Sequence, residues 1–142
     1  MNNNNNDNNH NNNNNNNRNT RILLVDDEYD ITLTFKIGLE DSGFVVDSFN
    51  DPLLALSNFK AGIYNLLLLD IKMPKMDGFE LFRQVKKKDS KVKVSFMTAF
   101  DIYNDNSKVD STLFNNNNGN KRIIQKPILI DDLVRQVKTE LA

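Results

Sequence analysis

Apolar positions along the chain fall into five short runs, separated by longer stretches of mixed polarity. The runs lie at 21–25, 45–49, 66–69, 92–97 and 123–124. Residues 66–69 are four consecutive leucines, and a run with no polar face is typical of a strand that is covered on both sides in a parallel sheet. The pattern predicts five strands, with the leucine run in the buried centre of the sheet.

The stretches between these runs have the spacing of amphipathic helices. Asp51 and Pro52 form a helix start, with Asp as the N-cap and Pro at the first helical position. Residues 101–114 are weakly patterned, and we predict a helix there as well. The predicted core faces are Ile31, Thr34, Phe35, Gly38 and Leu39 in the first helix, Leu53, Leu56 and Phe59 in the second, Phe79, Leu81, Phe82 and Val85 in the third, and Leu133, Val134, Val137 and Leu141 in the last.

The alternation of strands and helices predicts an α/β domain. Helices cover both faces of a parallel sheet in such domains, and crossovers are right-handed. The fold class we predict is a flavodoxin-like, doubly wound five-stranded parallel sheet of strand order 2-1-3-4-5 with five helices.

Composition separates a tail from this domain. Fifteen of the first 20 residues are Asn, and such a polar tract cannot bury enough apolar surface to order itself. We therefore expect a disordered tail over 1–20 and one domain over 21–142. A second Asn-rich segment, 115–120, is predicted to be an exposed loop.

Charge and residue usage exclude several classes of function. The net charge is −1 and acidic and basic residues are interspersed, so we expect no direct nucleic-acid binding. There is no cysteine for disulfides or thiolate chemistry. Since no apolar run approaches the length of a membrane span, we expect no membrane insertion and a cytoplasmic location.

Polar residues stand where four of the five predicted strands end. They are Asp26 and Asp27 after the first strand, Asp70 after the third, Thr98 after the fourth and Lys126 after the fifth. The first and third strands are neighbours in the predicted order, so three carboxylates converge at the edge where α/β sheets bind ligands. Carboxylates that close to one another need compensation, and their oxygens suit Mg²⁺.

This set of groups fits phosphoryl transfer, in which positioning and charge neutralisation do most of the work. Asp70 is the candidate nucleophile, which would form an aspartyl phosphate. We expect Lys126 to act as a point charge on a phosphoryl oxygen and the Thr98 hydroxyl to donate to another.

Four motifs give the chain a family resemblance. LLVDDE at 23–28, LLLDIKMPKMDG at 67–78, MTA at 97–99 and QKP at 125–127 stand in order, each at a strand end. Residues 21–142 thereby resemble the CheY-like receiver domain of two-component response regulators.

The resemblance implies roles for individual residues. Asp70 is the implied phosphoacceptor, Asp26 and Asp27 with Asp70 the Mg²⁺ site, and the main-chain carbonyl of Lys72 a further ligand. The implied phosphoryl donor is a sensor histidine kinase. The implied protein is not a turnover enzyme, because it catalyses only its own phosphorylation and dephosphorylation. With no effector domain after Ala142, we expect output through contacts with an unknown protein effector, onward phosphorelay or use as a phosphate sink.

Two features depart from the family pattern. Ile123 stands three positions before the strand-five lysine, where the family usually has an aromatic switch residue. The interval from Thr98 to Lys126 is also longer than usual, and the excess coincides with 115–120. As a further hypothesis, the long side chain of Lys72 and the ring of Phe100 hinder the water that removes the phosphoryl group.

Three other functions compete with phosphorylation. A pseudo-receiver would keep the fold and bind partners without phosphate; Ile123 and the Asn-rich segment favour it, whereas the complete acidic and lysine set disfavours it. A turnover enzyme of the haloacid-dehalogenase type would need a second acidic residue where Lys72 stands. A flavin or dinucleotide binder would need a glycine-rich phosphate cradle, which the sequence lacks.

Overall fold

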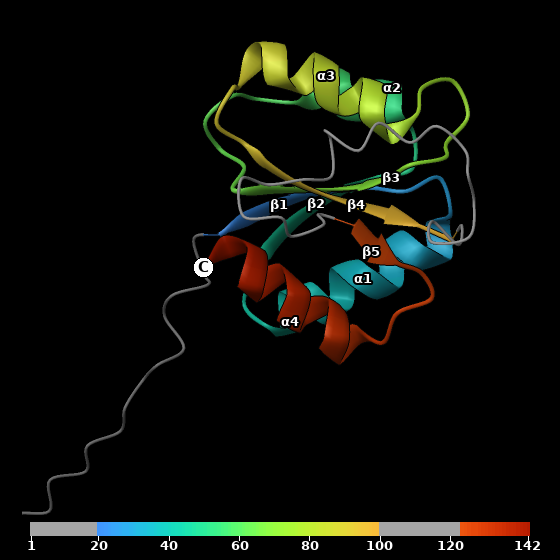
Figure 1. Ribbon diagram of the computed structural model, residues 1–142, viewed down its shortest axis with the longest axis vertical. Coiled ribbons are helices and arrows are strands. Elements are labelled where there is room, and N and C mark those ends of the chain that lie inside the picture. The colour runs from blue at the N-terminus through green and yellow to red at the C-terminus, as the bar shows by residue number, and fades with distance from the viewer. Residues whose placement is uncertain (1–19, 100–122) are drawn as a thin grey trace, which may run out of the picture.

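The computed structural model describes residues 20–99 and 123–142, and there it forms a three-layered α/β fold (Figure 1). The strands are β1 (Arg21–Val25), β2 (Val45–Phe49), β3 (Leu66–Asp70), β4 (Lys93–Thr98) and β5 (Ile123–Gln125). The helices are α1 (Tyr29–Asp41), α2 (Pro52–Asn58), α3 (Gly78–Lys88) and α4 (Ile130–Leu141). The helix predicted at 101–114 and the loop predicted at 115–120 lie outside the described residues, as does the tail at 1–19.

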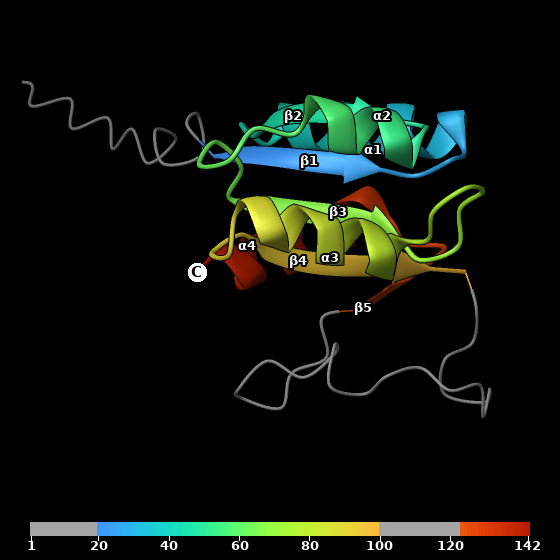
Figure 2. The same cartoon turned by 90° about the horizontal axis from the view of Figure 1, so that it is seen from above.

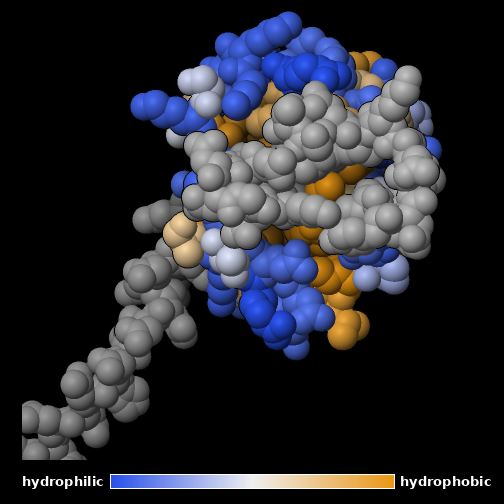
Figure 3. Space-filling model, in the orientation of Figure 1, coloured by the Kyte–Doolittle hydropathy of each residue, from blue (hydrophilic) through white to orange (hydrophobic). Residues whose placement is uncertain are grey.

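The five strands form one parallel sheet of order β2-β1-β3-β4-β5, which confirms the predicted topology. Viewed from above, the strands follow one another in that order (Figure 2). Helices α2 and α3 cover one face, and α1 and α4 cover the other (Figure 1). The outward side chains of the upper and lower helices in Figure 3 are mostly hydrophilic.

The leucine run divides its side chains between the two layers of the core. Leu67 and Leu69 belong to the cluster that holds the buried residues of α2 and α3, whereas Leu66 and Leu68 belong to the cluster of α1 and α4. Successive side chains of a strand point to opposite faces, so a strand with helices on both sides must be apolar throughout. The position of β3 at the centre of the sheet follows directly.

Two predicted core positions were wrong. Thr34 is exposed, and Thr32 takes its place in the core, where its hydroxyl donates to the Tyr29 carbonyl at 2.9 Å. Leu53 is 45% exposed, and the short helix α2 buries Pro52 and Ala55 instead. The other predicted positions of α1 are buried or partly buried, so only one position of that face was wrong, whereas in α2 the buried positions lie one residue earlier than predicted. Packing against the sheet sets which side of a short helix faces inward.

Aspartates cap the starts of α2 and α3, and the first of these caps was predicted from the sequence. The Asp51 carboxylate accepts from the Leu53 N–H at 2.9 Å and caps α2, and Asp77 accepts from the Glu80 N–H at 2.8 Å and caps α3. Among the helices of the described residues, none has the length and apolar character that a membrane span requires.

Candidate functional site

Parallel strands end at the same edge of a sheet, and this edge gathers the predicted site residues. In the strand register Val25 lies beside Leu69, Asp70 beside Met97, and Thr98 beside Gln125. Asp26 and Lys126, which directly follow β1 and β5, therefore reach the same edge as Asp70. The structure brings together residues that are 100 positions apart in the chain.

Three carboxylates form the centre of the site. Asp26, Asp27 and Asp70 each offer an oxygen within 4.8 Å of the others. Asp26 and Asp70 are buried, whereas Asp27 is exposed and leaves the cluster open to solvent. An all-oxygen cluster with one side open matches the ligands of Mg²⁺, which keeps several water molecules. The donor chemistry therefore fits that ion.

Lys126 supplies the positive charge of the site. Its Nζ lies 2.7 Å from Asp26 Oδ2 and 3.5 Å from Asp70 Oδ1, and the side chain is only 7% exposed. Burial alone would lower the pKa of Lys126, but the hydrogen bond with Asp26 and the charges of Asp26 and Asp70 together raise it. The lysine therefore stays charged, and with all three carboxylates ionised the cluster carries a formal charge of −2.

The pKa of Asp70 is raised to about 7. Burial is the largest cause, and the negative charge of Asp26 adds to it; Lys126 opposes both, and Asp27 raises the pKa further. A cation near Asp70 would lower this pKa again, because a positive charge favours the ionised form of the carboxyl group.

Thr98 and Lys72 are placed differently with respect to this cluster. Thr98 is buried at the end of β4, and its carbonyl accepts from the Lys126 N–H at 2.8 Å. This main-chain bond holds β5 in register beside the site. Lys72 lies exposed in the loop between β3 and α3, and the role of its main-chain carbonyl as a ligand stays a prediction.

Gly78 allows this loop to return to the site. Its N–H donates to the Ile71 carbonyl at 2.9 Å, and a Cβ at this position would collide with the main-chain oxygen of Asp70. Lys75 in the same loop has a φ of 72°, in the left-handed region that most side chains avoid. The loop is thus held in one specific conformation beside Asp70.

Asn50 contributes to the site and was missed in the sequence. Its Nδ2 donates to the Asp26 carbonyl at 2.8 Å and to the Thr32 hydroxyl at 2.9 Å. Asn50 directly follows β2, so a polar residue stands at the end of all five strands. No role was predicted for this position from the sequence. Its position directly after a strand, like the positions of the other site residues, was the signal that could have identified it.

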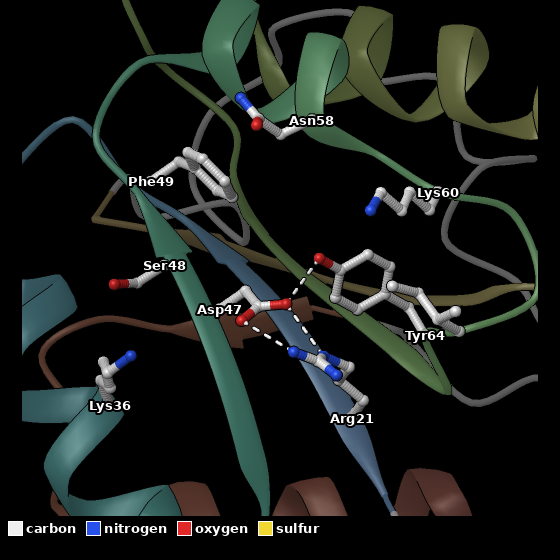
Figure 4. A pocket seen from close by; sticks show the side chains of 9 residues that line it. Arg21, Lys36, Asp47, Ser48, Phe49, Asn58, Lys60 and Tyr64 are labelled. Atoms are coloured by element: carbon white, nitrogen blue, oxygen red, sulfur yellow. Dashed lines mark hydrogen bonds and ion pairs between the residues drawn. The ribbon is translucent and has the colours of Figure 1, made fainter.

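A second hollow lies beside the edge strand β2 and shares no residue with the acidic site (Figure 4). It has a volume of about 420 Å³. The Asp47 carboxylate there accepts from Arg21 Nε at 2.9 Å and from the Tyr64 hydroxyl at 2.7 Å. The bond from Arg21 is the main reason that the pKa of Asp47 is lowered, while burial and the bond to Asp47 raise the pKa of Tyr64. These bonds tie β2 to β1 and to the segment before β3.

Comparisons with known proteins agree with this geometry. Residues 22–138 match the family model of the response regulator receiver domain. The response regulator receiver protein CpdR of Brucella abortus is 31% identical over 121 residues, which cover 85% of this chain and 96% of CpdR. Hybrid signal transduction histidine kinase B of Dictyostelium discoideum is 33% identical over 135 residues, which cover 85% of this chain and 7% of the kinase.

Several other curated relatives are longer than the matched part. The chain spans 34% to 51% of six transcriptional regulatory proteins that it matches.

Solved structures of one response regulator also match. TrrA of Thermotoga maritima in complex with Mg²⁺ and BeF is 32% identical, with a TM-score of 0.69 over 87% of this chain and 99% of that chain. A structure of the histidine kinase ThkA in complex with TrrA matches at 31% identity with the same coverage and TM-score.

Proposed function

The chain belongs to the family of response regulator receiver domains, and on that premise we propose that it is phosphorylated on Asp70 in a Mg²⁺-dependent reaction. Members of the family are signalling modules of two-component systems. The observation that carries the proposal is the convergence of Asp26, Asp27 and Asp70 within 4.8 Å, with Lys126 bonded into the cluster.

Each group has a task in the transfer. An Asp70 carboxylate oxygen forms a new bond to phosphorus, and the bond from phosphorus to the donor's histidine nitrogen breaks. Lys126, held beside Asp70, offsets the charge of a phosphoryl oxygen, and the Thr98 hydroxyl donates to another. Asp26, Asp27 and the Lys72 carbonyl would hold Mg²⁺ together with Asp70. When bound, this ion neutralises charge on the phosphoryl oxygens.

A sensor histidine kinase is the proposed donor. TrrA forms a complex with the histidine kinase ThkA, and helix α1 of this chain offers a surface for such a contact. Tyr29, Leu33 and Ile37 are 65%, 43% and 52% exposed and stand four residues apart on one side of the helix. The row begins three residues after Asp26, and Asp26 lies in one cluster with Asp70. A protein bound to this row would therefore lie close to the proposed nucleophile, Asp70. Output is proposed to pass through contacts with a protein effector.

The test is the intact mass of the protein after incubation with acetyl phosphate and Mg²⁺. We expect one added phosphoryl group, and none in Asp70→Asn or in the presence of EDTA. Asp77→Asn is the matched control, because Asn retains the cap of α3 and this variant should still be phosphorylated.

A pseudo-receiver is the second candidate, and Ile123 is the observation that favours it. This residue is partly buried and packs against the core on the α2 and α3 side, at the position where the family usually has an aromatic residue. An absence of phosphorylation combined with an absence of beryllofluoride binding would favour this candidate over phosphorylation.

A further inference from the structure

The loop between β2 and α2 contacts both of the loops that surround the acidic site. It contains only Asn50 and Asp51, two adjacent residues with different partners. Asn50 contacts the loop that carries Asp26 and Asp27, whereas Asp51 contacts the loop that carries Lys72. The inference that follows rests on the proposed Mg²⁺ site and concerns what holds that site in shape.

Asn50 fixes the peptide group that joins Asp26 to Asp27. The Asp26 carbonyl can only accept, so the amide nitrogen of Asn50 must face it, at 2.8 Å. The second N–H of the amide goes to the Thr32 hydroxyl, which itself donates to the Tyr29 carbonyl. Because this peptide connects two predicted ligands, its orientation constrains the backbone from which both carboxylates project.

Asp51 fixes the opposite loop. Its Oδ1 caps α2, which leaves Oδ2 to accept from Lys75 Nζ at 3.0 Å. Lys75 is the residue with the left-handed φ and lies three positions after Lys72. The ion pair therefore holds the loop at its conformationally unusual residue, close to the carbonyl predicted to bind Mg²⁺.

We propose that Asn50 and Asp51 are positioning residues for Mg²⁺: together they set the distance between the two loops that carry its ligands. Neither residue needs to touch the ion. Partners that orient metal ligands commonly change metal affinity by about 10- to 100-fold when they are mutated. Asn50 acts through one well-formed contact to the ligand loop, so its effect should fall near the lower end of that range.

The first test compares Asn50→Ala with Asn58→Ala by isothermal titration with Mg²⁺. Asn58 is the matched control, because its amide also donates to a main-chain carbonyl, that of Leu54 at 2.8 Å, but away from the site. We expect Asn50→Ala to weaken Mg²⁺ binding about tenfold and Asn58→Ala to leave it unchanged. Urea unfolding in EDTA shows that each variant is folded at the titration conditions.

The second test uses Lys75→Met and Asp51→Asn. Asn keeps the cap of α2 but loses the ion pair. Removing the positive charge of Lys75 would by electrostatics alone tighten Mg²⁺ binding, whereas loss of positioning weakens it. We therefore expect weaker binding in Lys75→Met, by about threefold for a half-exposed ion pair, and no additional loss when Asp51→Asn is combined with it.

The outcomes separate this inference from the proposed function. Wild-type affinity in Asn50→Ala, or tighter binding in Lys75→Met, would overturn the positioning role while leaving the Mg²⁺ site intact. A wild-type protein that binds no Mg²⁺ would overturn the proposed site and the inference with it.

Discussion

Replacing Asp70 by Asn should stabilise the Mg²⁺-free protein at neutral pH. Asn has nearly the same shape as Asp but carries no charge, so it removes the repulsion from Asp26 and Asp27. Lys126 keeps its shorter contact, 2.7 Å to Asp26. The residue proposed to carry out the chemistry is therefore one that the fold holds at a cost in stability.

The magnitude follows from the pKa of Asp70, which rises from 3.8 to about 7 on folding. Each pKa unit corresponds to about 1.36 kcal/mol, so the full difference corresponds to about 4 kcal/mol. Because the cluster is open to solvent at Asp27, we expect about half of that, about 2 kcal/mol. The sign is fixed by linkage: the folded state binds the Asp70 proton more tightly than the unfolded state. The contribution of Asp70 to stability is therefore greatest below about pH 4 and falls as the pH rises to about 7.

The assay is urea unfolding of both proteins in EDTA between pH 4 and pH 8. The free energy of unfolding of Asp70→Asn should exceed that of wild type by about 2 kcal/mol at pH 7.5, and the difference should vanish towards pH 4. Addition of Mg²⁺ should then stabilise wild type more than the variant. A difference that does not depend on pH, or a variant less stable than wild type at pH 7.5, would refute the reasoning.

Three further predictions concern stability. Lys126→Met leaves the buried Asp26 without its cation, so the free energy of unfolding at pH 7.5 should fall by about 3 kcal/mol; urea unfolding that shows no loss would contradict this. Gly78→Ala places a Cβ against the main chain of Asp70 and should lower the free energy of unfolding by at least about 1 kcal/mol. An unchanged thermal midpoint would show that the loop can move to accommodate the Cβ without a loss of stability. Tyr64→Phe removes the hydrogen bond to Asp47 and should lower stability by about 1 kcal/mol above pH 5. Since the pKa of Asp47 is lowered in the folded protein, chiefly by its bond from Arg21, this difference should shrink as the pH falls below about 4, and a constant difference in urea unfolding would argue against it.

Much of the site was predictable because its residues occupy equivalent places. Asp26, Asp70 and Lys126 each stand at the carboxyl end of a strand, and the parallel topology alone brings such positions to one edge. Asn50 occupies the same kind of place, but its role depends on two contacts across the site that no local pattern reveals. The ion pair between Asp51 and Lys75 was not predicted for the same reason.

The sequence by itself determined the order of elements, the buried central strand and the residues available for chemistry. Periodicity and helix capping are local properties, so Leu66–Asp70 and the cap at Asp51 could be assigned without a structure. Only the tertiary structure decided that Thr32 and Ala55, in place of Thr34 and Leu53, face the core. It also decided that Lys126 bonds Asp26 more closely than Asp70. These outcomes depend on how helices settle on the sheet and on distances between side chains far apart in the chain, which spacing along the sequence does not contain.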